Sequence, residues 1–172
     1  MLAIIQAVSA EEISTARDLM LEYAQWLGFD LCFQGFEEEL RALPGKYAPP
    51  AGRLLLASWE GQVAGMGALR PMDEAGACEM KRLYVRPAFR GHAIGLTLAE
   101  KLVRDAREIG YARMRLDTVP GKMDRAIAMY RQLGFREIGP YYGTPVEHTL
   151  FMELALQSIR DHTRKFENTM EM

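Results

Sequence analysis

The chain has 172 residues and a formal net charge of −2, which fits one domain with a full hydrophobic core. Hydrophobic residues make up 49% of it and charged residues 26%, a composition that excludes a largely disordered protein. The slight acidity excludes nucleic-acid binding through a general excess of positive charge, so any affinity for phosphate must come from a local site.

Cysteine and histidine counts argue against a metal centre. Cys32 and Cys78 are too few for a disulfide framework or a four-cysteine zinc site. The three histidines lie far apart and show no HExxH spacing, so we expect no metal. No apolar run approaches the roughly 20 residues that span a bilayer, and the N-terminus lacks the basic region of a signal peptide. We therefore expect a cytoplasmic protein with no membrane partner.

The first third of the chain predicts one strand, two helices and a loop. The capping-box pair Ser9 and Glu12 marks the start of the first helix. Apolar residues recur in that helix at three- and four-residue spacing, which is typical of one buried stripe. Three prolines and two glycines in nine residues predict the loop. These elements cover residues 3–8, 9–28, 36–43 and 44–52 in that order.

The remaining two thirds alternate between strands and helices. On the expected strand at 111–118, Arg113, Arg115 and Asp117 share one face, which we interpret as a solvated row of charges. The full order, β-α-α-β-β-β-α-β-α-β-β, predicts a mixed α/β or α+β domain over residues 1–156, followed by a polar tail over 157–172. We expect strands at 53–59, 63–70, 78–86, 111–118, 135–139 and 148–156, and helices at 93–109 and 122–133.

The segment 81–95, KRLYVRPAFRGHAIG, carries the chemistry. A strand ends at a proline, a short loop with arginine and glycine follows, and a well-patterned helix begins. The first-turn amides of such a helix have no partner within the helix, and its dipole favours an anion, so the pattern is typical of a phosphate site. The dinucleotide fingerprint and the Walker pattern are both absent. The alternative is a plain strand-to-helix turn in which Gly91 only relieves backbone strain.

The same segment resembles the acyl-CoA-binding motif of the GNAT superfamily of N-acetyltransferases, whose pattern is Arg/Gln-x-x-Gly-x-Gly/Ala after a strand that reads like Leu-Tyr-Val. Arg90, Ala93 and Gly95 occupy its three defining positions, with alanine in place of the first glycine. As an alanine, Ala93 is expected to keep a negative φ. The strand match is Leu83-Tyr84-Val85.

A second stretch, MDRAIAMYRQLGF at 123–135, resembles the C-terminal motif of the same family. Ala126, Tyr130 and Gly134 match that motif, whereas Met123 replaces the asparagine that often opens it. The resemblance covers about residues 3–156. It implies the GNAT fold, α+β with a central mixed sheet of about six to seven strands flanked by about four helices, and acetyl-CoA as co-substrate.

The family pattern also implies where acetyl-CoA binds. Two diverging strands, 78–86 and 111–118, would form a V-shaped gap in which the pantetheine arm pairs with exposed backbone. A backbone N–H near Val85 would stabilise the developing oxyanion. The diphosphate would lie on the amides of the following loop, to which His92 and Ile94 contribute backbone only. The implied cofactor-binding residues are Leu83, Tyr84, Val85, Arg90, Gly91, His92, Ala93, Ile94, Gly95, Met123, Ala126 and Tyr130.

Two residues match catalytic positions of the family. Tyr130 corresponds to the general acid that protonates the departing thiolate. Glu79, eleven residues before Arg90, matches the general base of the histone-acetylating branch; the alternative is an exposed strand residue paired with Lys81 or Arg82.

Acceptor-binding candidates come from two aromatic stretches. Phe29 and Phe33 lie in the first, and Tyr141, Tyr142 and His148 lie in the loop before the last strand; core or dimer surface is the alternative for both stretches.

The resemblance thus predicts transfer of an acetyl group from acetyl-CoA to a primary amine of a small or amino-acid-like acceptor. The alternatives are a protein N-terminal or lysine acetyltransferase and a non-catalytic acyl-CoA-binding module. We expect no nucleic-acid partner, and a homodimer is possible.

Overall fold

A seven-stranded sheet organises the protein. The computed structural model describes residues 1–28, 31 and 35–156, and the predicted tail at 157–172 lies outside them. In the described part the sheet order is β1-β2-β3-β4-β5-β7-β6. Its strands are β1 (Leu2–Gln6), β2 (Arg53–Trp59), β3 (Gln62–Pro71), β4 (Ala77–Val85), β5 (Arg113–Thr118), β6 (Arg136–Ile138) and β7 (Leu150–Ala155). This confirms the predicted mixed α+β class and strand number.

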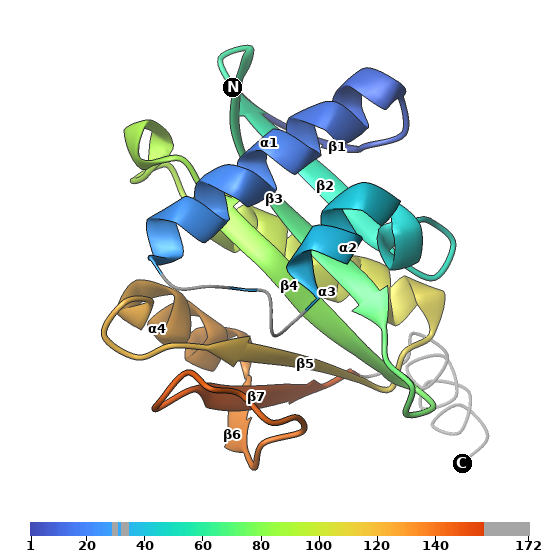
Figure 1. The fold of residues 1–172 in the computed structure, drawn as a ribbon, viewed down its shortest axis with the longest axis vertical. Helices are drawn as coiled ribbons and strands as arrows, with labels where there is room; N and C mark the ends of the chain where they lie inside the picture. The colour runs from blue at the N-terminus through green and yellow to red at the C-terminus, as the bar shows by residue number, and fades with distance from the viewer. Residues whose placement is uncertain (29–30, 32–34, 157–172) are drawn as a thin grey trace, which may run out of the picture.

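Helices cover both faces of this sheet, and the described residues contain the expected four. In Figure 1, α1 and α2 lie on the near face and α3 on the far face. The helices are α1 (Ala10–Leu27), α2 (Phe36–Ala42), α3 (Ile94–Ile109) and α4 (Asp124–Leu133), with single 3₁₀ turns η2 (Gly45–Tyr47) and η3 (Pro87–Phe89). The 3₁₀ turn η2 interrupts the segment 44–52, which we expected to be loop throughout.

Capping explains where α1 begins and ends. The Glu12 N–H donates to Ser9 Oγ, and Glu12 Oε2 accepts from the Ser9 N–H, so the predicted capping box is present. Gly28 ends the helix in the left-handed conformation, with φ of 75°.

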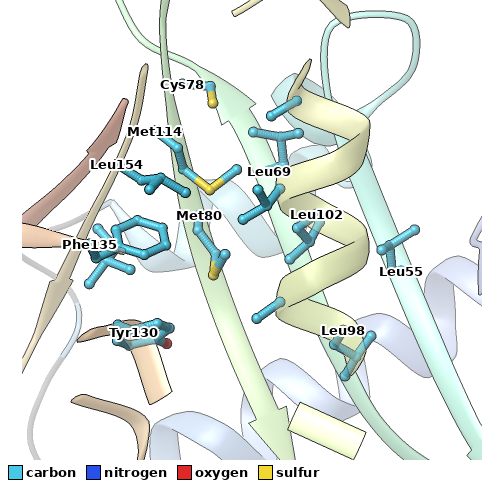
Figure 2. Packing of buried hydrophobic residues seen from close by; sticks show 14 of the residues in the cluster. Leu55, Leu69, Cys78, Met80, Leu98, Leu102, Met114, Tyr130, Phe135 and Leu154 are labelled. Carbon is cyan, nitrogen blue, oxygen red and sulfur yellow. The ribbon is translucent and has the colours of Figure 1, made fainter. Parts of the chain in front are cut away.

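Two hydrophobic clusters fill the two faces. The cluster under α3 includes Leu98, Leu102 and Met80, and α4 joins it through Tyr130 (Figure 2). The other cluster packs α1 and α2 on β2 and β3. The sheet is therefore covered on both sides, and the end of α1 and helix α4 both lie near the end where β4 and β5 diverge.

β4 and β5 are parallel and separate after a short pairing. Ala77, Cys78 and Glu79 pair with residues 113–115, and no further pair joins the two strands. β4 continues to Val85, so its second half extends past the last residue that pairs with β5. This is the V-shaped gap that the family resemblance implied.

A β-bulge reorients the second half of β4. Met66 of β3 faces Tyr84 and Ala68 faces Lys81, so one β3 residue opposes both Arg82 and Leu83. Arg82 adopts φ of 58°, a left-handed conformation that is unfavourable for a side chain with a Cβ. Because of this extra residue, the side chains of Lys81 and Arg82 do not alternate between the two faces of the sheet, and both lie outside the apolar cluster under α3.

Candidate active site

A cavity of about 520 Å³ occupies the gap between β4 and β5. Its walls come from the C-terminal end of α1, from β4 beyond Glu79, from the turn before α3, from the end of β5, from the start of α4 and from parts of the segment 142–149. The segments that the sequence linked to a cofactor therefore surround one space.

The turn before α3 forms one end of this cavity, where Gly91, Ala93, Ile94 and Gly95 line the wall. The helix begins after Ala93 with no side-chain cap in the described residues, so its first amides are available to an anion. Ala93 has φ of 55°, so the expectation of a negative φ is wrong. The turn is left-handed at the position where the family pattern has glycine, and it stores the strain that a Cβ brings there.

Arg90 and His92 play different parts in this turn. The Arg90 Nε donates to the Val85 carbonyl oxygen at 3.1 Å, which ties the turn to the end of β4. His92 does not line the cavity; its ring stacks on Trp59, with 4.4 Å between centroids. A backbone contribution from His92 stays a prediction.

Tyr130 lies deep in the cavity wall opposite β4. Only 7% of the residue is exposed, and its ring packs edge-on against Phe135 (Figure 2). Burial raises the pKa of the Tyr130 hydroxyl, so this group stays protonated at neutral pH. Within the described part of the chain no hydrogen bond to this hydroxyl is present, which leaves its proton available to a ligand.

Met123 and Ala126 of the second motif also line the cavity. The Thr118 hydroxyl donates to the Met123 sulfur at 3.1 Å. A thioether has no N–H or O–H to offer, so the polar contact of the family's asparagine is not reproduced at this position.

Glu79 is not on the cavity wall. Its carboxylate accepts from Arg70 Nε at 3.0 Å and from the Tyr141 hydroxyl at 2.6 Å, and only 3% of the residue is exposed. The alternative of an exposed Glu79 is wrong, because the residue is buried, and its carboxylate pairs with Arg70 on the neighbouring strand. The geometry also does not match the prediction of a general base, since the strand pairing places Glu79 where β4 and β5 are still joined.

The carboxylate that does line the cavity is Asp117 at the end of β5. It accepts a hydrogen bond from the Tyr142 hydroxyl, and one oxygen lies 3.6 Å from the Lys81 Nζ. Burial acts to raise the pKa of Asp117, but the Lys81 charge and the Tyr142 hydrogen bond outweigh it, so the pKa is lowered. Our interpretation of the row Arg113, Arg115 and Asp117 as solvated is therefore wrong for Asp117 and for Arg115, whose side chains are each 15% exposed.

The bulge residue Arg82 lies beside Asp117 on the cavity wall and is held from behind. Its guanidinium makes two hydrogen bonds to Glu39 of α2, at 2.8 and 3.1 Å. Glu39 also accepts from the Tyr47 hydroxyl at 2.9 Å. This network holds the Arg82 side chain at the cavity wall. No sequence motif predicted the network.

The acceptor-binding predictions fare unevenly. Tyr142 lines the cavity, whereas Tyr141 and His148 do not. Tyr141 instead packs on Phe151 and bonds to Glu79. Phe29 and Phe33 lie outside the described residues. Among the described residues no group of His, Cys, Asp or Glu side chains could hold a metal ion, and none of the helices there is long and apolar enough to cross a membrane.

Comparisons with known proteins agree with this geometry. The sequence model of the Acetyltransferase (GNAT) family matches residues 17–135. An uncharacterized N-acetyltransferase of Schizosaccharomyces pombe is 37% identical over 147 residues, which cover 85% of this chain and 90% of the relative.

Two solved structures share the fold at low identity. A GNAT-family acetyltransferase of Staphylococcus aureus superposes with a TM-score of 0.74 at 20% identity, covering 91% of this chain and 100% of that one. An acetyltransferase of Salmonella typhimurium, solved with acetyl-CoA, has a TM-score of 0.64 at 21% identity and covers 91% and 94%. The family match and the extended identity to the yeast relative show that this chain is an N-acetyltransferase of the GNAT family.

Proposed function

We propose that this protein transfers the acetyl group of acetyl-CoA to the primary amine of a small or amino-acid-like acceptor. One observation carries the proposal: the splayed strands enclose a cavity that joins a helix start without a side-chain cap in the described residues to a partly buried carboxylate. The Salmonella neighbour that was solved with acetyl-CoA supports the choice of donor.

The donor end fits the cofactor chemistry. The turn from Arg90 to Gly95 presents a cation and backbone amides to a diphosphate, and the end of β4 from Leu83 to Val85, past its pairing with β5, presents backbone to an amide-rich arm. An alanine Cβ at Gly95 would lie 3.6 Å from the nearest side chain, Val85, so this turn is open rather than filled. Bound acetyl-CoA would supply the activated acetyl thioester.

The acceptor end fits an amine. Asp117 is a partly buried carboxylate on the cavity wall, and a carboxylate in that environment attracts a cation. Because its pKa is lowered, Asp117 is a weak base, and we assign it to binding the protonated amine rather than to removing the proton.

The reaction then requires one proton at the sulfur. The bound ammonium first loses one proton to water, because only the neutral amine attacks. Attack then forms the nitrogen–carbonyl bond and breaks the carbon–sulfur bond, and the second proton that the nitrogen loses balances the one that the sulfur gains. Tyr130 holds a proton on the cavity wall, so we assign it the donation to the departing sulfur.

A thiol-release screen tests the proposal. Acetyl-CoA is offered with amino acids, polyamines, aminoglycosides and peptides, and products are identified by mass. We expect saturable release with at least one small amine, and Asp117→Asn should raise the acceptor KM while leaving the affinity for CoA unchanged. Release with peptides alone would favour a protein acceptor, and tight CoA binding without release would reject acetyl transfer.

A further inference from the structure

Two cations from separate loops share one tryptophan at the mouth of the cavity. The Arg90 guanidinium lies 5.1 Å from the centroid of the Trp26 ring, and the Lys122 Nζ lies 4.8 Å from it. All three residues line the cavity. Trp26 comes from the last turn of α1, Arg90 from the turn before α3, and Lys122 from the connection between β5 and α4. The end of α1 lies next to α4 in Figure 1.

This arrangement places like charges around one neutral ring. The indole face is electrostatically negative, so it attracts both cations and offsets part of their repulsion. Such a contact at an exposed site is weaker than a charge-assisted hydrogen bond to a phosphate oxygen. A doubly charged anion that enters between Arg90 and Lys122 would therefore be a stronger partner for both than the indole is.

We propose that Lys122 is a second cationic ligand for the cofactor diphosphate, and that Trp26 is a positioning residue that holds Lys122 and Arg90 at the cavity mouth until the diphosphate takes them over. The inference rests on the proposed function only in taking a CoA thioester as the ligand. It also gives the second motif a polar contact, because Met123 has no donor and the preceding residue supplies one.

The arrangement is cooperative across three elements. Removal of the Trp26 ring leaves the two loops without their shared contact, so both cations must be ordered when the diphosphate binds. We take this ordering cost to exceed the free energy of the weak indole contacts that binding breaks. Trp26→Ala should therefore weaken CoA binding although the indole itself contributes no charge. Trp26→Phe keeps an aromatic face and should rescue most of the loss.

Calorimetry on the full chain tests the role of Lys122. Lys122→Ala should lower the affinity for CoA about tenfold, as expected for one charge-assisted contact, and should reduce its salt dependence. The same variant should bind acetyl-pantetheine, which has no diphosphate, as the wild-type protein does. Lys46→Ala is the matched control, because Lys46 is exposed on η2 and does not line the cavity. Unchanged CoA affinity in Lys122→Ala would overturn the assignment.

Fluorescence tests the role of Trp26 independently of turnover. The chain has two tryptophans, so Trp59→Phe leaves Trp26 as the reporter. We expect saturating CoA to change its emission with the affinity seen by calorimetry, and acetyl-pantetheine to leave it unchanged. Constant emission at saturating CoA, or an equal response to acetyl-pantetheine, would reject the proposal that the diphosphate draws the two cations away from Trp26.

The two proposals fail separately. If CoA binding depends on Lys122 but no acceptor is acetylated, the proposed function is rejected and the diphosphate site stands. If acetyl transfer proceeds while Lys122→Ala binds CoA normally, only the further inference is rejected.

Discussion

The two ends of the β4–β5 pair are formed by the same two strands but differ in role: one end is held together by charges paired between strands, and the other lines the cavity. At the paired end, Glu79 and Arg115 face each other in register and each charge has a cross-strand partner, with Arg70 on one side and Glu153 on the other. At the splayed end, the Lys81 Nζ and the Asp117 Oδ1 lie 3.6 Å apart on the wall of the cavity.

The difference teaches that strand separation, rather than residue type, decides which carboxylate meets a ligand. Glu79 is buried and Asp117 partly buried, both acids lie on the side of the sheet that faces away from the cluster under α3, and each accepts a hydrogen bond from a tyrosine hydroxyl. Only Asp117 lies past the last paired residues, so only Asp117 reaches the space between the strands. We expect substitutions at the paired end to change the free energy of unfolding, and substitutions at the splayed end to change CoA binding and turnover.

Gly95→Glu should have the largest effect, at the splayed end. A carboxylate in the turn before α3 repels a diphosphate, so we expect at least about 1000-fold loss of CoA affinity by calorimetry. The fold should survive, because a Cβ at Gly95 meets Val85 at an ordinary 3.6 Å. Gly95→Ala is the matched control and should retain binding. Undiminished affinity in Gly95→Glu would place the diphosphate elsewhere.

Tyr130→Phe tests the catalytic side of the splayed end. Removal of a proton donor that acts in the transition state should lower kcat about 100-fold and leave the KM for acetyl-CoA nearly unchanged. Steady-state kinetics on the best acceptor of the screen measures both constants. A raised KM with normal kcat would mean that Tyr130 binds the cofactor and donates no proton.

Glu79→Gln sharpens the comparison from the paired end. Loss of the buried carboxylate weakens the contact with Arg70, so we expect the free energy of unfolding to fall by about 2 kcal/mol in urea titrations. Turnover of the folded variant should change less than about threefold. Glu153→Gln, in the same row but more exposed, should cost less. A 100-fold loss of kcat at unchanged stability would restore Glu79 as the general base.

Ala93→Gly should have the smallest effect, and it should stabilise. Ala93 has φ of 55°, where a Cβ costs roughly 1–2 kcal/mol, while glycine adds freedom to the unfolded chain. We expect a net gain of about 1 kcal/mol in the free energy of unfolding. Ala88→Gly, in the preceding 3₁₀ turn, is the control and should destabilise. A lower free energy of unfolding in Ala93→Gly would contradict the backbone strain that we assign to Ala93.

Local patterns determined much of the fold. The capping box at Ser9, the apolar stripes of α1 and α3, and the glycines that end the helices are short-range signals, so the order of the described elements follows from the sequence alone. The two motifs around Arg90 and Tyr130 could also be found in the sequence, because each is one short stretch of chain at the start of a helix or within it.

The tertiary structure decided which charged residues form the site. Glu79 and Asp117 are 38 positions apart, and nothing local to either shows that β4 and β5 part between them. The bulge at Arg82, the support of Arg82 by Glu39 from α2, and the meeting of Arg90 and Lys122 on Trp26 all join segments distant in the chain. Sequence periodicity reports the conformation of one element, whereas a site depends on where several elements end relative to one another, and only packing sets that.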